Sequence, residues 1–176
     1  MADVYGLNQF LQELRNTGLR LGYQFQVTIE QLDGLQFFAA STTLPGKTIN
    51  PVEVPYFGQT FRIPTNADYG GEWSITTRVD NELKIKKALE KWMDEFSDLT
   101  KNGGGNKKVT SYNVRIDLLD NDLQTINDTY TLVGVFPTGL GELSLDLSAA
   151  DVVTMDVTLT FQYWYRGADG SDDPLK

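Results

Sequence analysis

Clustered carboxylates are the residues best suited to chemistry in this chain, because opposed acids can hydrolyse a bond and several oxygen ligands can hold a cation. Asp120-Asn121-Asp122 resembles the start of a calcium loop, but the spaced ligands and the late glutamate are missing. Asp and Asn are also ordinary hairpin-turn residues. We therefore expect no catalytic and no metal site, with a paired-acid hydrolase as the remaining catalytic alternative. The two acidic clusters are Asp117, Asp120, Asp122 and Asp128, and Glu142 with Asp146.

The lack of cysteine and histidine removes most other catalytic arrangements. The sequence contains neither residue, so it has no disulfide, no thiolate or imidazole metal ligand and no histidine-activated nucleophile. Carboxylate-pair catalysis and phosphate chemistry with bound Mg²⁺ stay open. The composition favours a protein that is not an enzyme. We also expect no cofactor and no small-molecule substrate.

The glycine-rich segment KNGGGNKK, residues 101–108, is the other place where phosphate could bind. A phosphate-binding loop needs a strand before it and a helix that begins with Gly-Lys-Ser/Thr after it. Here a predicted helix precedes the glycines and a predicted strand follows them. We interpret the segment as a flexible surface loop.

The charge balance bears on possible partners. A net charge of −9 argues against sequence-specific nucleic-acid binding, which needs a basic face. It favours solubility, or a surface that lies near a polyanion without binding it. No apolar run approaches the roughly 20 residues of a membrane helix, and residues 1–15 do not form a secretory signal. Synthesis in the cytosol is expected.

Alternation with a period of two predicts that much of the chain is strand. In residues 151–165, apolar side chains hold one parity, and threonines, Asp156 and Gln162 hold the other. One long strand with a packed face and a polar face is expected there. Asp33-Gly34 predicts a hairpin that joins the first two of the remaining strands, and the PTGLG segment ends the strand of 129–136. These other predicted strands are residues 22–30, 35–41, 73–79, 112–118, 129–136 and 142–147.

Two amphipathic helices are predicted. Apolar residues at i, i+3, i+4 and i+7 indicate a short helix over residues 7–15. A longer helix of about 81–99 follows Asp80, which is suited to cap it. Its apolar stripe includes Trp92 and Phe96, and we expect this stripe to pack on a sheet.

Residues 48–64 predict a hairpin arm at a sheet edge. Prolines at 51, 55 and 64 cannot donate to an interior ladder. Gly58-Gln59 is the predicted turn. Tyr56, Phe57 and Phe61 are costly to leave in water, so a partner is expected to complete the arm.

These elements predict one mainly β domain over residues 1–165. Its expected architecture is an antiparallel sandwich or barrel with one flanking helix, a short N-terminal helix and the extended hairpin arm. Residues 166–176 are polar and rich in Gly and Asp, and they are predicted to be a disordered tail. The arm and the final strand are the edges expected to pair with neighbouring copies.

Four segments in order carry a resemblance to a known family. They lie at residues 41–46 (STTLPG), 55–82, 134–148 and 152–164. Together they are similar to the tail tube proteins of contractile-tailed bacteriophages, over roughly residues 22–164. The acidic tail beyond residue 165 and the basic 101–108 loop depart from that pattern. The motif positions are Leu44, Pro45, Gly46, Trp73, Pro137, Thr138, Gly141, Glu142, Leu143, Tyr163 and Trp164.

The resemblance implies a structural virion protein with the phage tail tube fold. Its hexameric rings would stack into a tube inside a contractile sheath, and phage DNA would pass through the lumen without sequence-specific binding. The implied partners are copies of itself and the sheath, baseplate and tail terminator proteins, with assembly in the host cytoplasm. The residues expected at inter-subunit contacts are Val52, Glu53, Val54, Tyr56, Phe57, Phe61 and Arg62.

Other interpretations remain open from the sequence. A tube-like protein of the baseplate or tail end would share the fold but would not stack without limit. A secretion-system or pyocin tube would share the architecture. A monomeric β-sandwich that binds carbohydrate would need Trp73, Trp92 or Trp164 on its surface.

Overall fold

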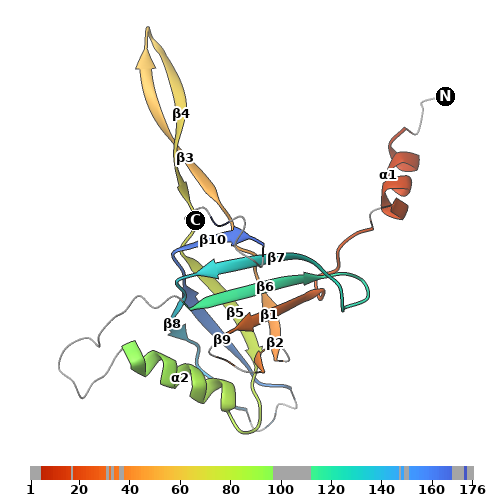
Figure 1. Ribbon diagram of the computed structural model, residues 1–176, viewed down its shortest axis with the longest axis vertical. Coiled ribbons are helices and arrows are strands. Elements are labelled where there is room, and N and C mark those ends of the chain that lie inside the picture. The colour runs from red at the N-terminus through yellow and green to blue at the C-terminus, as the bar shows by residue number, and fades with distance from the viewer. Residues whose placement is uncertain are drawn as a thin grey trace.

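Two four-stranded antiparallel sheets face each other, and a two-stranded ribbon projects from them (Figure 1). The computed structural model describes residues 5–16, 18–30, 32, 34–35, 38–96, 112–146, 148, 151–167 and 173. The described strands form a sandwich and not a closed barrel. The elements are α1 Tyr5–Asn16, β1 Phe25–Ile29, β2 Ala39–Thr42, β3 Thr48–Tyr56, β4 Gln59–Asp68, β5 Glu72–Arg78, α2 Lys84–Phe96, β6 Asn113–Leu119, β7 Ile126–Val133, β8 Phe136–Leu140, β9 Thr154–Thr160 and β10 Tyr163–Arg166.

The core lies between the sheets, whose strand orders are β1-β6-β7-β10 and β2-β5-β9-β8. Alternation works as predicted in β5 and β9, because one parity is buried and the other faces outward. In β6 the alternation holds up to Ile116, but Asp117 on the polar parity is also buried. Each large apolar side chain contributes about 1.5–3 kcal/mol when it is fully buried. The core includes Val27, Trp73, Ile75, Val114, Ile116, Leu132, Met155, Val157 and Leu159.

The predicted hairpin through Asp33-Gly34 is wrong. Strand β1 pairs with β6, and β2 pairs with β5 in the opposite sheet. Between β1 and β2 the chain makes successive turns in which the amide of Leu32 donates to Ile29 and that of Leu35 donates to Leu32. Both leucines are buried, so the connection dips into the core and carries the chain to the other sheet.

The prediction of one long strand over residues 151–165 is also wrong, because the segment forms two strands. Strand β9 ends at Thr160, and β10 belongs to the opposite sheet. At the step between them, the amide of Phe161 donates to Gly71 and that of Gln162 donates to Val133. A Cβ on Gly134, where the chain crosses from β7 to β8, would lie 2.6 Å from Cγ of Gln162. The two crossings therefore form one tight corner.

The chain around residues 136–146 also differs from prediction. The segment expected to turn forms the edge strand β8, with Pro137 at a register irregularity where no amide is needed. Of the predicted strand 142–147, residues 142–146 are described and form no strand. Pairing stops at Gly141, whose amide donates to Asp156, and Leu145 is 80% exposed. The residues after Leu140 alternate in sequence but have no strand partner among the described residues.

Both predicted helices are present. Helix α2 buries Ile85, Leu89 and Trp92, and the amide of Lys84 donates to the Asp80 carboxylate at 3.1 Å, as expected for a cap. Figure 1 shows α1 apart from the sandwich. Among the described residues, no helix is long and apolar enough to cross a membrane.

Two sequence predictions fall outside the described residues. They are the 101–108 loop and most of the 166–176 tail, although Arg166 belongs to β10. The division into one domain and a tail stays a prediction.

Candidate assembly surface

The β3–β4 ribbon, called the arm, is longer than predicted and turns one residue earlier. Tyr56 pairs with Gln59, which leaves Phe57 and Gly58 as a two-residue loop with φ of 47° and 73°. Two positive φ values in succession are typical of a type I′ turn, whose twist suits a hairpin. The ladder continues to Asp68, beyond the predicted end at residue 64. The ladder includes the Pro51–Pro64 pair, in which neither residue has an amide to donate. A register irregularity adjoins this pair, between Ile49 and Pro51.

One face of the arm is apolar. Val52 lies opposite Ile63 and Val54 lies opposite Phe61. Cross-strand partners share a face, so these four side chains form a continuous apolar row. Tyr56 extends this row toward the tip. The exposed fractions of these side chains are Val52 50%, Val54 40%, Tyr56 63%, Phe61 51% and Ile63 51%.

The opposite face of the arm is polar and rich in proline. Glu53 pairs with Arg62, and their side chains form an ion pair of 3.0 Å. Prolines 51, 55 and 64 lie on this face, with Thr60 opposite Pro55. Every residue of β3 and β4 is exposed, so no described part of the chain buries either face.

The structure separates the predicted contact residues into two faces and a tip. The apolar face carries Val52, Val54, Tyr56 and Phe61, and Glu53 and Arg62 lie on the other. Phe57 forms the tip and is 90% exposed. The prediction omitted Ile63, although its parity with Phe61 in the sequence places it on the apolar face. Whether these residues contact another subunit stays a prediction.

The motif positions spread around the sandwich. Leu44, Pro45 and Gly46 lie between β2 and the arm, where side-chain hydrogen bonds from Trp73 and Trp164 reach their segment. A Cβ on Gly141 would lie 2.8 Å from the backbone oxygen of Asp156, so a larger residue does not fit. The remaining positions lie in β8 (Pro137, Thr138), after it (Glu142, Leu143) and in β10 (Tyr163).

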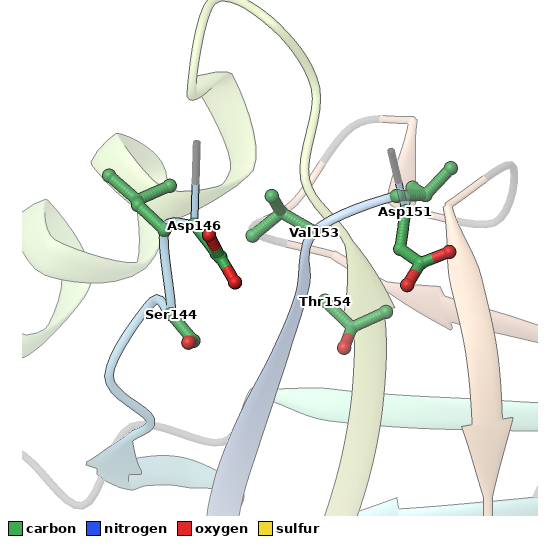
Figure 2. A pocket seen from close by; sticks show the side chains of 7 residues that line it. Ser144, Asp146, Asp151, Val153 and Thr154 are labelled. Atoms are coloured by element: carbon green, nitrogen blue, oxygen red, sulfur yellow. The ribbon is translucent and has the colours of Figure 1, made fainter. Parts of the chain in front are cut away.

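A hollow of about 640 Å³ lies where the chain leaves β8 and enters β9. Figure 2 shows Asp146 and Asp151 on either side of Val153. The Asp146 carboxylate accepts the amide and hydroxyl of Ser148 at 2.8 and 2.7 Å. These hydrogen bonds lower the pKa of Asp146, whereas a general acid needs a raised pKa. Asp146 is therefore unsuited to act as the general acid of a paired-acid reaction.

In the acidic cluster of residues 117–128, Asp120 and Asp122 lie in the turn between β6 and β7, as interpreted from the sequence, whereas Asp117 and Asp128 lie in those strands. Asp122 accepts the Thr125 hydroxyl at 2.6 Å and the amides of Gln124 and Thr125. These bonds, led by that hydroxyl, lower its pKa to about 2. Buried Asp117 accepts from Arg115 and Thr129. In the described part of the chain, no group of three or more acids could hold a metal ion.

The tryptophans do not form a surface for sugar binding. Trp73 and Trp92 are each 2% exposed. Trp164 packs partly buried against the core, with its ring centroid 5.5 Å from that of Tyr130. The carbohydrate-binding alternative lacks the exposed rings it requires.

Comparison with known proteins agrees with this architecture. The family described as phage tail tube protein matches residues 5–167. Tail tube protein gp19 of Enterobacteria phage T4 is 23% identical over 146 residues, covering 80% of this chain and 87% of that protein. Gp19 of Enterobacteria phage T6 matches with the same identity and coverage.

Solved structures share the fold. A chain of the extended sheath–tube complex of the PVC extracellular contractile injection system has a TM-score of 0.66 at 16% identity, over 89% of this chain and 97% of that one. A chain of the anti-feeding prophage tube-terminating cap has a TM-score of 0.65 at 17% identity, over 85% and 91%. Since the family match extends from α1 past β10, the chain belongs to the phage tail tube protein family.

Proposed function

We propose that this chain is the structural subunit of a contractile-tail inner tube, in which hexameric rings stack to form a conduit for phage DNA. Membership of the tail tube family supports the tube. The observation that carries the proposal is the arm, whose row of apolar side chains is exposed among the described residues. Such a row is unfavourable in water and favours association.

The arm is suited to bind a neighbouring copy. Its apolar face gains about 25 cal/mol for each Å² of apolar surface that a neighbour covers. A contact between the arm and a different surface is heterologous, so it generates a closed ring or an open stack and not a simple dimer. The edge strands β2 and β8 offer main-chain groups for further pairing.

The charge of the chain suits a wall beside DNA. Six copies would carry six times the −9 of one chain, and a negative wall forms few contacts with phosphates. The outer face of the β2-β5-β9-β8 sheet carries short hydroxyl side chains, and Asp156 there accepts the Thr76 hydroxyl at 2.7 Å. We assign this face to the lumen.

The expected partners are the sheath, baseplate and tail terminator proteins, and the expected location is the virion tail after assembly in the host cytoplasm. The role is structural and not enzymatic. A tube-capping or baseplate role is the second candidate, because the cap of the anti-feeding prophage resembles this chain as closely as the sheath–tube chain does. The two roles differ in stacking: a tube subunit should stack without limit, whereas a capping or baseplate protein should not.

Electron microscopy of the purified protein over a concentration and salt series tests the proposal. The wild type should form six-fold rings and hollow tubes, with preformed baseplates added as nuclei if tubes do not form alone. Phe61→Asp places a charge on the apolar face and should abolish assembly. Single rings that never stack would favour the capping role.

Thr60→Asp is the matched control, because it adds the same charge to the opposite face one residue away. It should assemble like the wild type. Both variants should melt at the wild-type temperature as subunits, since both positions are exposed. Assembly of Phe61→Asp at the wild-type level would refute the role of the arm. A wild type that stays monomeric with baseplates present would refute the tube.

A further inference from the structure

The segment that joins β2 to the arm, residues 43–47, is held at both ends by tryptophans. The indole N–H of Trp73 donates to the carbonyl of Thr43 at 2.7 Å. The indole N–H of Trp164 donates to the carbonyl of Gly46 at 2.9 Å. Trp73 belongs to β5 and Trp164 to β10, so each sheet of the sandwich holds one end. Pro45 between them has a fixed φ and no amide.

Aromatic rings hold the returning strand of the arm to the same place. Tyr69, directly after β4, meets the ring of Trp164 edge-on at a centroid distance of 6.1 Å. The ammonium group of Lys47 lies 4.9 Å from the Tyr69 ring centroid, within cation–π range. Trp164 therefore contacts the chain on both sides of the arm, at Gly46 and at Tyr69.

The return into β5 is fixed by a tight turn. The amide of Gly70 donates to the Asp68 carboxylate at 2.9 Å. Gly70 and Gly71 have φ of 84° and 69°, which favours glycine at both positions. The carbonyl of Gly71 accepts the amide of Phe161. The arm thus leaves and re-enters the sandwich through backbone that is hydrogen-bonded on both sides.

We propose that these contacts form a root clamp, made of residues 43–47, Trp73, Trp164 and Tyr69, that fixes the direction of the arm. In the described part of the chain no other segment buries the arm, because every residue of β3 and β4 is exposed. Trp73 and Trp164 are positioning residues, and they act through the root and not through contact with a neighbour. The clamp gives a role to motif positions 44–46, 73 and 164. Its use in assembly rests on the proposed function.

Distance measurement in the isolated subunit tests the clamp without assembly. The chain has no cysteine, so spin labels at Gln59→Cys on the arm and Ser74→Cys on β5 are unique. The wild type should give one narrow distance distribution by pulsed electron spin resonance. Trp164→Phe keeps an aromatic ring and removes the indole donor. Loss of one hydrogen bond should raise the ratio of displaced to docked arms roughly threefold and broaden the distribution.

Trp92→Phe is the matched control. Trp92 has the same side chain, but its indole nitrogen has no hydrogen-bond partner in the described part of the chain. It should leave the distribution unchanged. Tyr69→Ala tests the other side of the root and should broaden it. A displaced fraction in folded Trp164→Phe that is no larger than in Trp92→Phe, or a broad distribution in the wild type, would overturn the clamp.

Failure of the clamp and failure of the tube have different signatures. If the distribution broadens in Trp164→Phe but the wild type never assembles on baseplates, the clamp stands and the tube proposal fails. If the wild type assembles and Trp164→Phe keeps its narrow distribution, the tube stands and the clamp fails. If both hold, Trp164→Phe should need a higher protein concentration than Trp92→Phe to form tubes.

Discussion

Two antiparallel strand pairs in this protein have similar sequence patterns and opposite environments. Strands β5 and β9 alternate apolar and polar residues, and the apolar parity is buried. Strands β3 and β4 also alternate, yet none of their residues is buried. Val157 is 1% exposed, whereas Val54 is 40% exposed. Alternation therefore specifies a face but does not specify whether the same chain or another one covers it.

The difference assigns two roles to the same residue types. In β9 the apolar side chains stabilise the subunit, and in the arm they become stabilising only when another molecule covers them. Substitutions that remove apolar surface should consequently lower the stability of the subunit at one place and assembly at the other.

The largest expected effect comes from Leu159→Ala in β9. Leu159 is fully buried, so the substitution should lower the free energy of unfolding by about 2–5 kcal/mol. Its counterpart Ile63→Ala in the arm should lower it by less than about 1 kcal/mol, because half of that side chain is already exposed. Urea unfolding measures both. Equal losses would show that the arm is covered within the subunit.

A second, smaller effect compares two glycines. In Gly141→Ala the new Cβ would meet the Asp156 backbone at 2.8 Å, so unfolding should become easier by about 1–3 kcal/mol. Gly46→Ala, at the root of the arm, meets nothing within 4 Å and should change stability by less than about 1 kcal/mol. Thermal unfolding of the two variants decides. A costly Gly46→Ala would mean that the root is more tightly packed than the edge of the sandwich.

A third prediction compares the pH dependence of stability in the wild type and in Asp122→Ala. Asp122 lies in a turn of the sandwich and accepts hydrogen bonds from that same turn. The pKa of Asp122 is lowered from 3.8 to about 2. Its contribution is therefore complete above pH 3.8 and is lost as the pH falls through about 2. The difference in melting temperature between wild type and Asp122→Ala should shrink over that interval. An NMR titration midpoint of Asp122 near 3.8 would contradict this.

The smallest effect is expected for Glu53→Gln on the polar face of the arm. The ion pair with Arg62 is exposed on both sides, so its loss should change the stability of the ribbon by less than about 0.5 kcal/mol. Amide exchange of the arm measures this change, and added salt should reduce it further. A loss above about 1 kcal/mol would show that this face is better ordered than its exposure indicates.

Local patterns predicted the elements better than their partners. The buried parity of β9, the cap at Asp80 and the exposed aromatic residues between prolines in the arm were all readable in the sequence. The pairing of β1 with β6 and the crossing at Phe161 were not, because alternation does not encode which strand lies alongside. The root clamp was missed for the same reason, since Gly46 and Trp164 are 118 positions apart.

Because the arm is long, a small change in its angle at the root displaces its tip by a large distance. Strand β4 has 10 residues, and at about 3.3 Å per residue the ribbon extends roughly 30 Å. A tilt of roughly 10° at the root displaces the tip by about 5 Å, which is close to the spacing between neighbouring strands. If the arm binds a neighbour as proposed, a tilt of roughly 10° at the root would thus shift the tip by about one strand, so that an error at the root becomes a register error at the far end.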